Sequence, residues 1–65
     1  MRNLLKEIES TIEKNGFYQD DIIFLNINFI SESLQIDCDT LQEIARDLYF
    51  TIVIDYELFI GITKK

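Results

Sequence analysis

The sequence predicts a small α+β domain in the order helix, strand, helix, helix and two-stranded hairpin. Apolar residues recur three or four positions apart in three segments, a spacing typical of helices that bury one face. From Phe50 onward they recur at every second position instead, which is typical of strands. Because the chain has 65 residues, we expect a single domain, residues 1–65, with one small core.

The first helix is expected to begin near Leu4 and to end at Asn15 and Gly16. Its apolar residues Leu4, Leu5, Ile8 and Ile12 share one side, and charged residues occupy the other. Glycine suits the end of a helix because it adopts the left-handed conformation without a steric penalty.

A short strand is expected next, because the apolar run from Ile22 to Leu25 follows two aspartates. So brief a run also fits a buried helix. A second helix then fits Phe29 to Leu34, with Asn28 as its N-cap. Asp37 can cap a third helix that runs through Leu48.

The alternation from Phe50 to Thr63 predicts a hairpin, since one strand of that length is improbable in so small a domain. If all even-numbered residues share a face, Ile54 must lie opposite Leu58. The loop then has three residues, Asp55, Tyr56 and Glu57, although such loops usually contain a glycine.

One face of this hairpin would be filled by Phe50, Ile52, Ile54, Leu58, Ile60 and Ile62. The opposite face would still present Val53 and Phe59, with Tyr49 close by. We expect these three residues to form an apolar surface for a homodimer or another partner. The alternative is that the first strand or the chain end covers them.

The stretch FISESLQIDCDTLQEIARDL, from Phe29 to Leu48, spaces its apolar residues so that two short helices can cross. The residues at the crossing would be Ile30, Leu34, Ile36, Leu41 and Ile44, with the small Ser31 where the helices approach. This pattern resembles the winged helix-turn-helix family, and the hairpin up to Thr63 would be the wing. Gln35 stands at a turn position where glycine is common in that family.

The net charge of −6 is unevenly distributed, because residues 19–63 contain nine carboxylates and one basic residue, Arg46. The resemblance implies that the third helix would lie in the major groove of DNA, with the wing tip close to the phosphates. In this chain, however, both elements are acidic. Carboxylates at those positions repel phosphates, so binding of nucleic acid is disfavoured.

We therefore expect a small acidic protein-interaction module, a regulator or inhibitor that binds a basic or nucleic-acid-binding protein, even by mimicking the charge of DNA. The expected binding residues are Asp37, Asp39, Glu43, Asp47, Asp55, Tyr56 and Glu57. A simpler interpretation is that these carboxylates only keep the domain soluble. The alternative function is a dimeric DNA-binding transcription regulator that contacts phosphates through Arg2, Lys6, Lys14, Arg46, Lys64 and Lys65.

No enzyme activity, metal or cofactor is expected. The chain has no histidine, and Asp37, Cys38 and Asp39 offer two hard oxygens and one soft sulfur, which suit no common ion well. Cys38 is the single cysteine, which excludes an internal disulfide. An unpaired thiol, with neither a signal sequence nor an apolar run long enough to span a bilayer, favours a cytoplasmic location.

Overall fold

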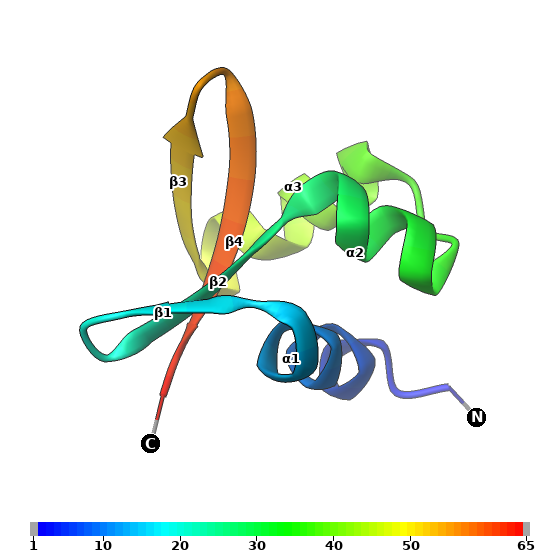
Figure 1. The fold of residues 1–65 in the computed structure, drawn as a ribbon. Helices are drawn as coiled ribbons and strands as arrows, with labels where there is room; N and C mark the ends of the chain where they lie inside the picture. Colours follow the sequence, from blue (N-terminus) through cyan, green and yellow to red (C-terminus); the bar gives the residue numbers. More distant parts are fainter. Residues whose placement is uncertain (1, 65) are drawn as a thin grey trace.

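The computed structural model describes residues 2–64, which form three helices and a four-stranded antiparallel sheet (Figure 1). In chain order these are α1 (Leu4–Asn15), β1 (Phe17–Gln19), β2 (Ile22–Asn26), α2 (Ile27–Leu34), α3 (Cys38–Leu48), β3 (Phe50–Ile54) and β4 (Glu57–Thr63). The predicted α+β class is confirmed, whereas β1 was not expected. Within residues 2–64, none of the helices has the length and apolar character needed to span a membrane.

The sheet has the strand order β1–β2–β4–β3, so β2 and β4 lie in its centre. Leu25 of β2 pairs with Ile60 of β4, and this central pairing joins the two hairpins. In Figure 1 the helices lie to one side of the sheet. One sheet face therefore packs against helices, and the other is left without a helical cover.

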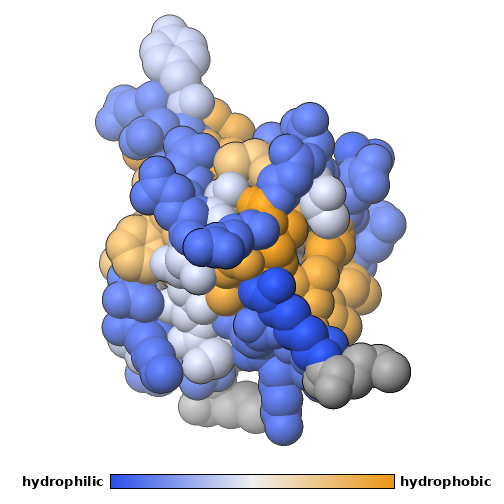
Figure 2. Space-filling model, turned by 90° about the vertical axis from the view of Figure 1, so that its right-hand side faces the viewer, coloured by the Kyte–Doolittle hydropathy of each residue, from blue (hydrophilic) through white to orange (hydrophobic). Residues whose placement is uncertain are grey.

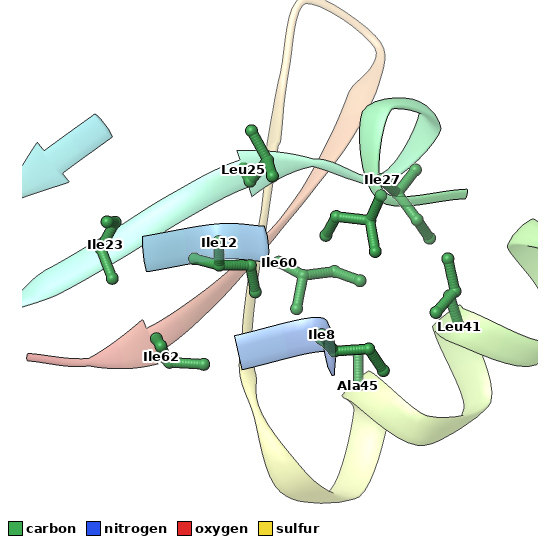
Figure 3. Close-up of a cluster of buried hydrophobic side chains, with 10 residues drawn as sticks. Ile8, Ile12, Ile23, Leu25, Ile27, Leu41, Ala45, Ile60 and Ile62 are labelled. Atoms are coloured by element: carbon green, nitrogen blue, oxygen red, sulfur yellow. The ribbon is translucent and has the colours of Figure 1, made fainter. Parts of the chain in front are cut away.

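The core lies between the helices and the covered sheet face (Figure 3). Ile8 and Ile12 of α1 point into it and are almost completely inaccessible to solvent. Burying a side chain of this size stabilises the fold by about 1.5–3 kcal/mol. The remaining members of the cluster are Ile23, Leu25, Ile27, Ile30, Leu41, Ala45, Ile60 and Ile62.

The N-caps of the last two helices show one confirmed prediction and one wrong one. The carboxylate of Asp37 accepts a hydrogen bond from the Thr40 amide at 3.2 Å, so Asp37 caps α3 as predicted. The cap of α2 is Asn26 rather than Asn28, because β2 continues directly into the helix without a loop. The Asn26 side chain accepts from the Asn28 amide at 2.8 Å.

Gly16 ends α1 as predicted, but for a different physical reason. Its φ of −80° and ψ of 173° are extended, so the left-handed conformation is not used. A Cβ at this position would lie 2.5 Å from the carbonyl oxygen of Phe24 and 2.6 Å from that of Ile12. Glycine is therefore required because α1 and β2 approach each other closely.

The predicted three-residue loop between β3 and β4 is wrong. The turn has two residues, Asp55 and Tyr56, with φ values of 52° and 66°, and Ile54 pairs with Glu57. Positive φ at both positions is the type I′ signature of two-residue hairpins. In this register Ile52 pairs with Phe59, so the even-numbered residues of β3 share a face with the odd-numbered residues of β4.

Candidate protein-interaction site

Three carboxylates form a line along α3. This acidic stripe consists of Asp39, Glu43 and Asp47, all exposed and spaced four residues apart. Leu41 and Ala45 of the same helix are completely buried in the core. Because consecutive residues are about 100° apart around a helix, positions two removed from the buried ones lie on the nearly opposite side. Packing of α3 on the core therefore turns the stripe to solvent.

The acidic stripe has no basic partner within residues 2–64. The one ion pair in this part of the chain joins Arg2 to Glu7 at 2.6 Å, near the start of α1. Arg46 also lies on α3, yet it makes no ion pair or hydrogen bond with the stripe. Within residues 2–64, none of the three carboxylates of the stripe is therefore held in an ion pair.

The hairpin tip, residues 55–57, forms a second acidic cluster. All three side chains are exposed, and Tyr56 is completely so, at 103%. The tip projects at the top of Figure 1, and the top of Figure 2 is coloured hydrophilic to neutral. Since β3 has five residues, it carries the tip about 17 Å away from the end of α3. Six of the seven predicted binding residues thus fall into two clusters, the acidic stripe and the hairpin tip, and the seventh, Asp37, lies at the start of α3.

The predicted apolar trio of Tyr49, Val53 and Phe59 does not form one surface. Val53 pairs with Leu58 on the side of the sheet that faces the helices, whereas Phe59 pairs with Ile52 and lies on the opposite side. Tyr49 is half-buried, and its hydroxyl donates to a carboxylate oxygen of Glu9 at 3.3 Å. Burial, the charge of Glu9 and this hydrogen bond raise the pKa of Tyr49 to about 12.

The uncovered sheet face carries the larger apolar surface. On it the ring of Phe17 lies 5.8 Å from that of Phe24 and 5.7 Å from that of Phe59, measured between centroids. Phe50, Ile52 and Ile54 of β3 share this face and are exposed. We call it the open sheet face. Phe17 was not expected here. All three residues of β1 are exposed, so this short segment has no alternation of apolar and polar residues that would indicate a strand.

Two of the basic residues of the DNA-binding alternative, Arg2 and Lys64, lie near opposite ends of α1. The Arg2 guanidinium donates to Glu7 and to the carbonyl oxygen of Leu34, near the start of α1. The Lys64 ammonium lies 4.5 Å from the ring centroid of Tyr18, beyond the other end of that helix. A twelve-residue helix is about 18 Å long, so these two cations are well separated. Lys65 lies outside the described residues.

A groove of about 730 Å³ runs between α1, the end of α3 and β4. Its polar lining includes Glu9, Glu13, Tyr18, Tyr49 and Lys64. Within residues 2–64, no three metal-ligating side chains come together.

Comparison with protein-family models, with curated proteins and with solved structures found no match to this chain. The exposed charge and apolar area of the chain itself are therefore the guide to its function.

Proposed function

We propose that this chain is a non-catalytic protein-interaction module of the winged helix type. It acts as a regulator or inhibitor that binds a basic or nucleic-acid-binding protein, with its carboxylates in place of the phosphates of DNA. The observation that carries the proposal is the acidic stripe, Asp39, Glu43 and Asp47, which is exposed and unpaired within residues 2–64.

The order of the elements supports the winged helix part of the proposal. A short turn joins α2 to α3, and α3 leads directly into the β3–β4 hairpin, which takes the place of the wing. In the sheet, β4 lies between β2 and β3, so the hairpin is anchored against the strand that precedes the two helices. The β1–β2 hairpin is then an addition to that arrangement.

The spacing of the stripe supports recognition of clustered positive charge. Four residues of helix rise about 6 Å, so the stripe is about 12 Å long. This length is close to the Debye length of about 10 Å at 0.1 M salt. The three carboxylates therefore act on an approaching partner as one patch. Such a patch mainly raises the association rate, and its effect decreases as salt is added.

Binding to a synthetic peptide rich in arginine and lysine tests this proposal. The test variant removes the stripe by Asp39→Asn, Glu43→Gln and Asp47→Asn. The control removes three exposed carboxylates elsewhere by Glu13→Gln, Asp21→Asn and Glu32→Gln. Both variants lose the same net charge, so a difference between them reports position rather than total charge.

We expect the unmodified chain and the control to bind the peptide at low salt, and the stripe variant to bind at least about tenfold more weakly. Equal loss in both variants would mean that only total charge matters, and would contradict the proposal. A gel-shift with duplex DNA at low salt addresses the alternative function. Clear retardation of the DNA would favour a DNA-binding regulator over the protein-binding module.

A further inference from the structure

Strand β3 forms an unpaired edge of the sheet. Its inner side pairs with β4, and within residues 2–64 no strand pairs with its outer side. Figure 1 shows β3 on the side of β4 that is away from α2, while α3 runs into the start of β3 and contacts it. All five residues of β3 are exposed, including Val53 at 64% and Phe50 at 50%. Both faces of the strand and its backbone edge are thus accessible to another chain.

β3 has none of the features that usually protect a sheet edge from pairing. Its sequence, FTIVI, contains no charge and no proline, and four of its residues are β-branched. The other edge, β1, has only three residues and is protected by its shortness. The unprotected edge is therefore the one on β3.

The two-residue turn determines which amides of β3 point outward. Ile54 and Glu57 flank the turn, so they form a pair that exchanges both backbone hydrogen bonds. Because hydrogen-bonded and non-hydrogen-bonded pairs alternate, the amides of Phe50 and Ile52 also point toward β4. The amides of Thr51 and Val53 therefore point away from the sheet and are available to a new strand.

We propose that two copies of this chain associate by antiparallel pairing of their β3 strands around a twofold axis at Ile52. Phe50 then lies opposite Ile54 of the second copy, and Thr51 lies opposite Val53 of the second copy. The two sheets become one continuous sheet. The open sheet faces of both copies join along Phe50, Ile52 and Ile54, so their apolar rows become continuous.

The distribution of charge selects a second copy as the occupant. Each chain has a net charge of −6, so self-association requires an interface free of carboxylates. β3 satisfies this condition, because in the proposed pairing Asp55 falls at the two opposite ends. The acidic stripe lies on α3, on the helical side of the sheet. The pairing needs no charge complementarity, because each uncharged β3 strand meets an identical one.

The area available indicates how tight this dimer is. Two five-residue strands and their side chains bury less than about 1,200 Å² in total, which is the range of weak, transient interfaces. We therefore expect dimerisation at tens of micromolar rather than at nanomolar concentration. Sedimentation equilibrium from about 10 to 500 µM covers the transition.

The variant Val53→Lys tests the pairing. Val53 points to the helical side of β3, so a lysine there disturbs edge pairing but not the stacking of two open sheet faces. The control Leu48→Lys adds the same charge at a residue of similar exposure, 60%, on α3. We expect the dissociation constant to rise at least about tenfold for Val53→Lys and to stay unchanged for Leu48→Lys.

Hydrogen exchange gives a second readout that needs no substitution. In the unmodified chain, exchange at the amides of Thr51 and Val53 is expected to slow as the concentration rises, because pairing protects them. A chain that is monomeric up to 500 µM would overturn the proposal. So would a dimer that Val53→Lys leaves intact, or one that both variants weaken equally.

Discussion

Replacing Gly61 by alanine is expected to destabilise the protein, although replacing a glycine by alanine often stabilises a protein at exposed positions. Gly61 lies in β4, opposite Phe24 of β2 and Phe50 of β3, and is buried. An added Cβ would lie 2.5 Å from two ring carbons of Phe24 and 2.8 Å from the Cγ2 atom of Ile22. Relaxed carbon contacts are about 3.5–4.0 Å, so the ring must move by about 1 Å.

Two opposing contributions determine the size of this effect. Alanine restricts the unfolded chain, which favours folding by about 0.4–1 kcal/mol. Against this, the Phe24 ring is only 7% exposed and packs against Phe17, so its displacement loses contacts. Overpacking of this kind costs about 1–3 kcal/mol. We therefore expect a net loss of about 1–2 kcal/mol in the free energy of unfolding.

Urea denaturation followed by circular dichroism measures this change. A double-mutant cycle with Phe24→Leu identifies its cause, because leucine leaves room for the new methyl group. In that background Gly61→Ala should cost at least about 1 kcal/mol less than in the unmodified chain. Two results would refute the reasoning: a Gly61→Ala protein as stable as the unmodified chain, or two substitutions whose effects simply add.

Three further predictions follow from the local geometry. The pKa of Tyr49 is raised from 10.0 to about 12, so the stability that its neutral form contributes is present below pH 10 and is lost as the pH rises towards 12. Urea unfolding across that range should show a steeper loss for the unmodified chain than for Tyr49→Phe. Gln35 adopts a left-handed conformation with φ of 56° at the end of α2, which glycine accepts without strain. Gln35→Gly should therefore raise the free energy of unfolding by about 1 kcal/mol, seen as a higher urea midpoint. Asp55 and Tyr56 both have positive φ, so the pair Asp55→Asn and Tyr56→Gly should stabilise the hairpin by about 1–2 kcal/mol; an unchanged midpoint would contradict the type I′ geometry.

The acidic stripe is the part of the candidate site that the sequence predicts best. Leu41 and Ala45 set the buried side of α3, and helical spacing then places Asp39 and Glu43 on the opposite side. The N-cap at Asp37 is equally local, since it depends only on the residues that follow it. A helix with one buried face thus reveals its orientation from the sequence, although α2 begins at Ile27, two residues before the expected start.

The sheet required the tertiary structure. The alternation in β3 indicates a strand, but both of its faces are exposed, so no burial pattern shows which residues point to the helices. The two-residue turn reversed the expected face of Phe50, Ile52 and Ile54, and β1 adds Phe17 to the same face. Pairing between distant strands decides such a surface, whereas periodicity along the chain records only local burial. The sequence by itself therefore determined the helices and the position of the negative charge on α3, and the fold decided the open sheet face and the unpaired edge.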